Sequence, residues 1–240
     1  MNSKKKFLIT ILFVLISLSF AGSVGFANTK RDILTKSGVT TPIVDGVIST
    51  AEYLSETSLA SGDFQLYWQI EVDSIFFGMV GTTTGWLAVG FNPTTAMQNA
   101  DMVFGWIFSN GSVITIDAFS TGPNGPHPAD IDLGGTVDIL SFNGTEGEEK
   151  TTIEFSRLLI TGDQYDNDIP SSGEYDIIWA LGNTDDFGLK HIKRGSATIN
   201  IGGTNGSSKT GSSSSSSEST IGFPFMLILL SLIGVLFHRK

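Results

Sequence analysis

Short segments in which apolar and polar residues alternate run through the middle of this chain. The clearest is Phe64–Val72, where every second side chain is apolar. That two-residue period is typical of a strand with one buried and one solvated face. Turn signals such as Asn110-Gly111 separate these segments, and no long stretch of sequence holds a helical period. Many short strands joined by turns predict an all-β domain, built as an antiparallel β-sandwich.

The predicted strands follow one another at spacings of about ten residues. They are Phe64–Val72, Ile75–Gly81, Trp86–Phe91, Met102–Phe108, Val113–Phe119, Val137–Phe142, Thr151–Phe155, Tyr175–Leu181 and Ser196–Ile201. Two other segments, Ser49–Leu54 and Arg157–Thr161, are each predicted to form about one helical turn.

The N-terminal end carries the pattern of a secretory signal peptide. Residues 1–27 combine the basic Lys4–Lys6, a long apolar run and small residues before Ala27. This pattern predicts cleavage after Ala27. An uncleaved N-terminal anchor is the alternative, and either one would export the domain that follows.

The C-terminal end carries the pattern of a membrane anchor. Residues 221–237 are uncharged and precede a basic end at 238–240, which predicts a transmembrane helix with a cytoplasmic C-terminus. A sorting signal that is later processed would have the same pattern. The Gly- and Ser-rich stretch 202–220 is typical of a flexible linker. We therefore expect an N-terminal extension at 28–42 and one exported, membrane-anchored domain at 43–201.

The composition excludes several classes of function. The absence of cysteine rules out disulfides, thiolate zinc sites, iron–sulfur clusters, thiol nucleophiles and covalent c-type haem. The net charge is −10, and residues 28–220 hold all 24 acidic residues. An acidic surface repels nucleic acid, because binding to a polyanion depends on cationic contacts to phosphate.

No catalytic motif is present in the sequence. It lacks a Gly-Xaa-Ser-Xaa-Gly elbow, a Gly-rich phosphate loop and a His-Glu-Xaa-Xaa-His pair. His238 follows the apolar end segment and His127 stands between two prolines, so His191 is the one well-placed imidazole. We therefore expect a binding or electron-transfer domain and not an enzyme.

Acidic residues gather in three predicted loops. They are Asp130 and Asp132; Asp163, Asp166 and Asp168; and Asp185 and Asp186. Loop carboxylates commonly stabilise turns while remaining solvated, so we expect these side chains to be exposed. A calcium site that bridges strands is the alternative.

Six segments, taken in order, resemble a known family. They are Gly85–Asn92, Ala96–Trp106, Asp117–Ser120, Thr152–Asp163, Ile178–Gly182 and His191–Gly195. In this order and spacing they resemble the DOMON domain, a family that includes the N-terminal domain of dopamine β-monooxygenase and the cytochrome domain of cellobiose dehydrogenase. The opening Val44–Ile48 also resembles the entry strand of this family and of its carbohydrate-binding relatives.

The resemblance implies an immunoglobulin-like β-sandwich that binds haem b or a sugar between its sheets. The axial ligands of haem-binding members fall on Met97 and His191, so the resemblance implies that these two residues hold the haem iron. Three aromatic residues are candidates for the pocket lining: Trp86, Phe91 and Trp106. Thioether and imidazole ligands favour six-coordinate, low-spin iron, which relays electrons and leaves no position free for oxygen.

Three hypotheses remain open at this point. The first is the membrane-anchored cytochrome domain, in which Lys190 is a rival ligand, Met102 is expected in the core and the redox partner is unknown. The second is a cell-surface carbohydrate-binding module, in which an exposed Trp would stack on a sugar ring. The third is a structural or adhesive surface domain without a ligand.

Overall fold

The computed structural model describes residues 40–203 and 209–210. These residues belong to one of the two compact units into which the chain divides. The predicted signal peptide at 1–27 and the predicted anchor at 221–237 lie outside the described residues, as do the basic end and most of the predicted linker. Within the described ranges, no helix is long and apolar enough to cross a membrane.

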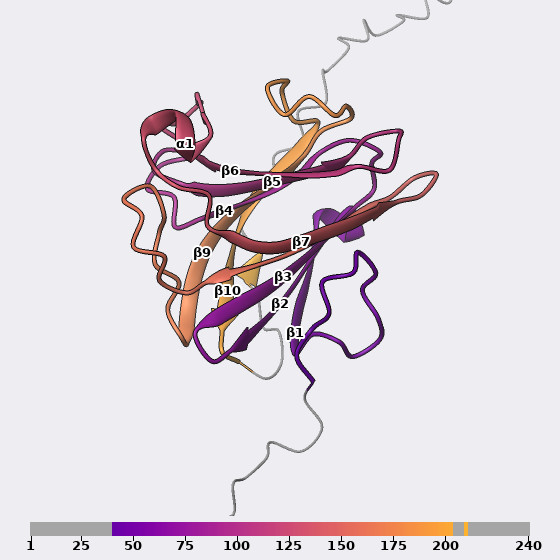
Figure 1. Cartoon of the computed structure of the whole chain (residues 1–240), viewed down its shortest axis with the longest axis horizontal. Coiled ribbons are helices and arrows are strands. Elements are labelled where there is room, and N and C mark those ends of the chain that lie inside the picture. Colours follow the sequence, from indigo (N-terminus) through magenta and orange to yellow (C-terminus); the bar gives the residue numbers. More distant parts are fainter. Residues whose placement is uncertain (1–39, 204–208, 211–240) are drawn as a thin grey trace, which may run out of the picture. The chain divides into compact units, whose positions relative to one another are not determined.

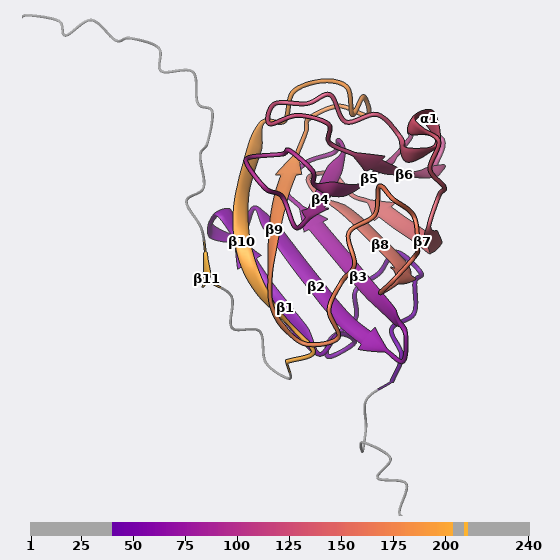
Figure 2. The same ribbon diagram turned by 90° about the vertical axis from the view of Figure 1, so that its left-hand side faces the viewer.

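Two antiparallel sheets packed face to face make up the described domain, as Figure 1 and Figure 2 show from two sides. The first sheet has the order β1-β2-β3-β8-β7, and the second has the order β11-β10-β9-β4-β5-β6. The strands of the first sheet are β1 (Ser55–Leu59), β2 (Phe64–Glu71), β3 (Ser74–Gly81), β7 (Ile139–Glu146) and β8 (Thr151–Leu158). Those of the second are β4 (Leu87–Phe91), β5 (Asp101–Ile107), β6 (Val113–Phe119), β9 (Gly173–Leu181), β10 (Lys193–Ile201) and β11 (Lys209–Thr210). The architecture is the all-β sandwich that the strand pattern predicts.

Each predicted strand has a counterpart in the structure. The largest differences are at β7, which continues to Glu146, at β8, which continues to Leu158, and at β10, which starts at Lys193. The sequence pattern missed β1, because this strand buries the polar Ser55 and Thr57 on its inner face and so lacks apolar alternation.

The two predicted helical turns are not found. Arg157 belongs to β8 and pairs with Ile75 of β3, so Arg157–Thr161 starts as strand. Ser49–Leu54 holds a single hydrogen-bonded turn, in which Glu52 N donates to Ser49 O at 3.2 Å. The helical turns of the described residues are elsewhere, at η1 (Ala60–Gly62) and α1 (Asp130–Leu133).

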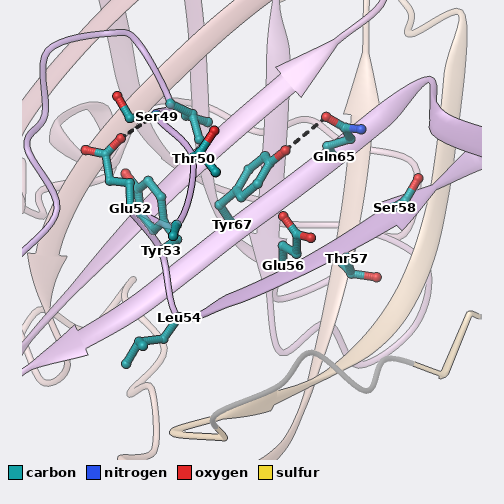
Figure 3. A pocket seen from close by; sticks show the side chains of 12 residues that line it. Ser49, Thr50, Glu52, Tyr53, Leu54, Glu56, Thr57, Ser58, Gln65 and Tyr67 are labelled. Carbon is teal, nitrogen blue, oxygen red and sulfur yellow. Dashed lines mark hydrogen bonds between the residues drawn. The ribbon is translucent and has the colours of Figure 1, made fainter. Parts of the chain in front are cut away.

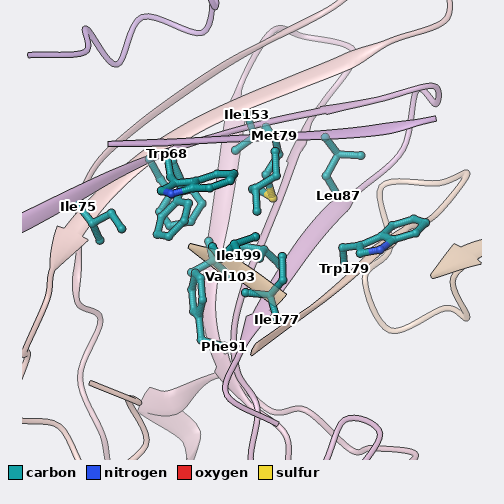
Figure 4. Packing of buried hydrophobic residues seen from close by; sticks show 14 of the residues in the cluster. Trp68, Ile75, Met79, Leu87, Phe91, Val103, Ile153, Ile177, Trp179 and Ile199 are labelled. Atoms are coloured by element: carbon teal, nitrogen blue, oxygen red, sulfur yellow. The ribbon is translucent and has the colours of Figure 1, made fainter. Parts of the chain in front are cut away.

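Side chains from both sheets fill the space between them. Figure 4 shows part of this interior, including Trp68, Phe91 and Trp179. Across the sheets, the ring centroids of Phe77 and Phe91 are 5.1 Å apart, and those of Phe64 and Trp179 are 5.1 Å apart. All four tryptophans are buried, with at most 6% of the residue exposed. The exposed Trp expected for sugar stacking is therefore absent from this domain.

The second sheet is covered on both faces at its centre. Every residue of β4 and β5 is buried. Leu87, Val89 and Phe91 belong to the cluster between the sheets, whereas Ala88 belongs to a separate cluster on the outer face. Gly90 shares that outer face, because side chains alternate along a strand.

Loops cover this outer face. The Phe104 ring of β5 lies 4.9 Å from His127 and 5.3 Å from Phe187, measured between ring centroids. His127 belongs to the loop after β6, and Phe187 to the loop between β9 and β10. The candidate site lies beneath these loops, against the outer face of the second sheet.

Candidate functional site

A cavity of about 250 Å³ lies on the outer face of the second sheet. Met97 and His191, which come from different loops, both line it. The other lining residues come from β4, β5, β9, β10 and the covering loops: Ala88, Gly90, Ala96, Met102, Asn124, Ile178, Trp179, Ala180, Arg194, Gly195 and Ser196. The position corrects the expectation of a site between the sheets, since that space is filled by the core.

Backbone hydrogen bonds fix the loop that carries Met97. Met97 N donates to Pro123 O at 3.3 Å, and Ala100 N donates to Met97 O at 3.0 Å. The preceding Ala96 has a φ of 51°, a left-handed conformation that is costly for a residue with a Cβ. The loop therefore presents the half-buried Met97 thioether in a defined conformation.

His191 lies just before β10, anchored by the backbone bond from Ile192 N to Leu181 O at 2.9 Å. Its Nε2 lies 3.3 Å from Arg194 Nη1, while its Nδ1 is buried without a hydrogen-bond partner. Burial, and then the positive charges of Arg194 and Lys190, lower the pKa of His191. The imidazole is therefore neutral at pH 7, which is the form that binds metals.

Small residues of β4 and β9 form part of the cavity floor. Ala88 pairs with Ala180, and Gly90 pairs with Ile178. A Cβ on Gly90 would lie only 2.8 Å from Ile178 Cγ1 and 3.3 Å from Met102 Cγ. Glycine at position 90 thus makes room for the side chains of Ile178 and Met102, which also line the cavity.

The sequence analysis missed two residues of this cavity. Met102, expected in the core, is indeed buried, but it also lines the cavity from β5. It brings a second thioether into the same space as Met97. Arg194 supplies the cationic group next to His191.

The aromatic candidates do not line the cavity. Phe91 is a correction, because it points into the interior between the sheets and is fully buried there. Trp86 and Trp106 lie in the outer-face cluster beside the cavity, and Trp106 stacks on Phe187 at 5.7 Å. Lys190 is exposed and is also not among the lining residues.

Two aspartates expected in solvent are buried instead. Asp130 is 0% exposed, and the Asp166 side chain is 1% exposed. Asp166 lies close to two further buried aspartates, Asp101 and Asp117, and the three place carboxylate oxygens within 4.8 Å of one another. The chain therefore has a group of oxygen donors, apart from the cavity, that could hold a metal ion.

A second hollow, the polar groove, lies on the other sheet. This groove of about 910 Å³ runs between residues 48–54 and the outer face of β1 and β2 (Figure 3). The rings of Tyr53 and Tyr67 lie in it with centroids 5.9 Å apart. Tyr53 donates to the buried Glu154 Oε1 at 2.7 Å, and Tyr67 donates to Gln65 Oε1 at 3.1 Å. The groove therefore combines oriented aromatic rings with polar groups.

Known proteins match the described domain. The DOMON domain family model matches residues 60–182. MOXD1 homolog 2 of Drosophila melanogaster is 31% identical over 101 residues, which are 42% of this chain and 13% of that protein. DBH-like monooxygenase protein 1 of Homo sapiens is 32% identical over 126 residues, which are 52% of this chain and 19% of that protein. The chain spans less than a quarter of the length of the curated relatives it matches.

Among solved structures, the cytochrome b domain of pyranose dehydrogenase from Coprinopsis cinerea aligns with this chain. The TM-score is 0.49 and the identity is 17%, over 62% of this chain and 83% of that chain.

Proposed function

This chain belongs to the DOMON domain family, and we propose that its outer-face cavity binds haem b through Met97 and His191 and relays electrons. The observation that carries the proposal is that these two residues, from separate loops, line one cavity. A thioether and a neutral imidazole are the ligand pair that cytochromes use for low-spin haem iron.

The residues of the cavity fit such a group. Ala88, Ala180 and Ile178 give the cavity an apolar lining, which suits the apolar macrocycle of haem. Arg194 and Ser196 supply hydrogen-bond donors for the carboxylates that haem carries. The volume of about 250 Å³ is smaller than the roughly 300–1,000 Å³ of typical ligand sites. We therefore expect the covering loops to move outward when haem enters.

The protein groups have separate roles in this proposal. Bound haem supplies a one-electron ferric–ferrous couple. His191 is kept neutral by burial and by Arg194, and its Nε2 would be free to hold iron once Arg194 moves away from it. Met97 would supply the thioether ligand, and Met102 is its rival, since both thioethers line the cavity. Iron held by an imidazole and a thioether would transfer electrons and would have no position free for a substrate.

The proposal includes export and anchoring. The signal-peptide pattern of residues 1–27 and the apolar stretch 221–237 with its basic end support a domain held outside the membrane. The linker at 202–220 would let the domain reach a redox partner beside the membrane. Protease added to intact cells is expected to cut this linker, and protection of the linker until lysis would contradict the topology.

Titration of the purified full chain with haemin tests the haem proposal. We expect saturation at one haem per chain, accompanied by a change in the absorption spectrum. Protease should at the same time cut the covering loop at 182–192 more readily, because the loop moves outward to admit haem. Failure to bind haemin would reject the proposal.

A second candidate function is saccharide binding at the polar groove. Tyrosine rings stack on sugar faces, and the acidic and amide side chains of the groove suit sugar hydroxyls. If this holds, electrophoresis through polysaccharide gels should retard the wild type, and Tyr67→Ala should migrate freely. Met97→Leu is the control, because it alters only the haem cavity. Equal migration of the wild type and Tyr67→Ala in every polysaccharide would rule the groove out.

A further inference from the structure

Four aspartates and one arginine, here called the buried acidic cluster, lie together inside the domain. Asp101 begins β5, Asp117 lies in β6, Asp130 begins α1 and Asp166 lies in the loop after β8. Asp101 and Asp130 are 0% exposed, and Asp117 is 3% exposed. Arg157 of β8 reaches the cluster with its side chain 1% exposed. These side chains come from both sheets, so the cluster lies where the sheets meet and not in the outer-face cavity.

The hydrogen bonds of the cluster orient some oxygens and leave others without partners. Asp101 Oδ2 accepts from Arg157 Nη1 at 2.6 Å and from Asn167 N at 2.9 Å, while its Oδ1 is buried with no partner. Asp117 is arranged in the same way: Oδ2 accepts from Asp138 N at 2.7 Å and Oδ1 has no partner. Each carboxylate is thus held by one oxygen and leaves the other available.

Asp130 adds a further buried carboxylate whose oxygens lack hydrogen-bond partners among the described residues. Both of its carboxylate oxygens are buried and have no hydrogen-bond partner in the described structure. Buried polar groups in proteins are nearly always paired, so an unpaired buried carboxylate indicates a missing partner. The neighbouring charges that act on Asp130 are those of Asp117, Asp101 and Asp166, followed by that of Asp163, so Asp130 lies near the other three members of the cluster.

The charges of the cluster do not balance. One guanidinium faces four carboxylates: Arg157 Nη1 lies 2.6 Å from Asp101, and Nη2 lies 3.2 Å from Asp166. The negative charges of the cluster thus exceed its positive charge, and a divalent cation would offset part of this excess.

We propose that Asp101, Asp117 and Asp166 bind one divalent cation, calcium in preference to others. Their carboxylate oxygens lie within 4.8 Å of one another. Oxygens on opposite sides of a calcium ion are separated by roughly 4.6–5.2 Å, because each Ca–O distance is about 2.3–2.6 Å. Asp130 adds a further negative charge beside the ion.

The ligand atoms of the group favour calcium over other metal ions. All donors are carboxylate oxygens, and no histidine of the described residues joins the group, which disfavours zinc and copper. Magnesium holds its waters tightly and demands near-octahedral geometry, whereas calcium accepts irregular sets of oxygen ligands. A buried cluster with a fixed Arg157 therefore suits calcium better.

The proposed ion would connect separate parts of the fold. Asn167, whose backbone donates to Asp101, also donates its side-chain amide to Phe91 O at 3.0 Å and to Asn99 O at 2.9 Å. Asn99 belongs to the loop that carries Met97. Calcium at the cluster would thus stabilise the 159–172 loop and, through Asn167, the base of the Met97 loop.

Calorimetric titration of the full chain with CaCl2 tests this proposal, after purification in mild detergent and removal of divalent ions with a chelator. We expect one calcium per chain and a higher unfolding temperature, because the ion binds only the folded state. MgCl2 at the same concentration should give a smaller shift. Binding should weaken below about pH 6, since protons compete for the carboxylates. If CaCl2 at about 1 mM gives neither heat of binding nor a thermal shift at pH 7.5, the proposal is wrong.

Matched variants locate the site. Asp117→Asn preserves the shape of the side chain and should weaken calcium binding by about tenfold or more, because affinity follows ligand charge. Asp132→Asn makes the same charge change on the exposed side of α1 and should bind like the wild type. An equal loss in both variants would show a general surface effect and overturn the assignment. If Asp117→Asn does not fold, Asp166→Asn takes its place, and calcium binding equal to that of the wild type would overturn the assignment.

Discussion

Arg194 Nη1 lies 3.3 Å from Nε2 of His191. A guanidinium can only donate hydrogen bonds, so Nε2 is the acceptor and the imidazole proton is on the buried Nδ1. The nitrogen lone pair best placed to bind iron is thus covered by a cation in this structure. Haem binding through Nε2 requires Arg194 to move away, which couples the arginine to both the pKa and the ligation of the histidine.

Replacement of Arg194 should raise the pKa of His191. The positive charge of Arg194 disfavours the imidazolium, and Lys190 has the same effect more weakly. Arg194→Gln should therefore shift the NMR titration of His191 to higher pH, and Lys190→Gln should shift it less. The same or a lower pKa in Arg194→Gln would show that the contact has no electrostatic effect.

The two thioethers of the cavity can be separated by substitution. If Met97 binds iron, Met97→Leu should retain haem through His191, lower its reduction potential and open a position for carbon monoxide. Met102→Leu should then leave the spectrum unchanged, as should Met79→Leu, which alters the interior core. If Met102→Leu instead lowers the reduction potential and admits carbon monoxide, and Met97→Leu leaves the spectrum unchanged, Met102 is the ligand.

Filling the floor of the cavity should block haem uptake. A Cβ at position 90 already comes within 2.8 Å of Ile178, so Gly90→Val intrudes into the cavity and should cost about 1–3 kcal/mol of stability. Val89→Ala, on the opposite face of the same strand, destabilises the domain without entering the cavity. Equal haem affinity in Gly90→Val and Val89→Ala would argue against binding on this face.

The buried acidic cluster should make stability depend on pH when divalent cations are absent. Burial raises the folded-state pKa values of Asp101, Asp117 and Asp130 to about 7, 6 and 8, well above the usual aspartate value of 3.8. The folded chain then binds more protons than the unfolded chain, so the free energy of unfolding falls as the pH rises from about 4 to about 8.

Urea unfolding in chelator at pH 5 and pH 8 measures this effect. Asp130→Asn removes one of the raised pKa values and should reduce the difference between the two pH values, and Asp132→Asn should not. Calcium should restore stability at pH 8. An unfolding free energy that rises with pH in the wild type, but not in Asp130→Asn, would contradict the assigned charges.

Much of the fold follows from alternation in the sequence, because a sandwich strand buries every second side chain. Phe64, Leu66 and Trp68 reveal β2 in this way. The pattern cannot reveal β1, whose inward Ser55 and Thr57 are polar but buried by neighbouring elements. Burial of polar residues depends on tertiary contacts that the local sequence does not contain.

Less of the candidate site than of the fold could be predicted from the sequence. Met97 and His191 came from a family resemblance, and spacing alone does not bring two loops to one cavity. Met102 could have been found, since β5 is apolar at nearly every position and a strand of this kind needs cover on both faces. The burial of Asp101 could also have been predicted, because Asp101 is two residues before the inward Val103 and therefore lies on the same face of the strand. A carboxylate at a core position indicates a partner such as Arg157.

The absorption spectrum of the haemin-loaded chain, recorded oxidised, reduced and reduced with carbon monoxide, tests the central claim most directly. The account predicts a low-spin b-type spectrum in both oxidation states that carbon monoxide leaves unchanged, because Met97 and His191 fill both axial positions. His191→Ala should lose stable haem binding. No haem uptake by the wild type, or an unchanged low-spin spectrum in His191→Ala, would contradict it.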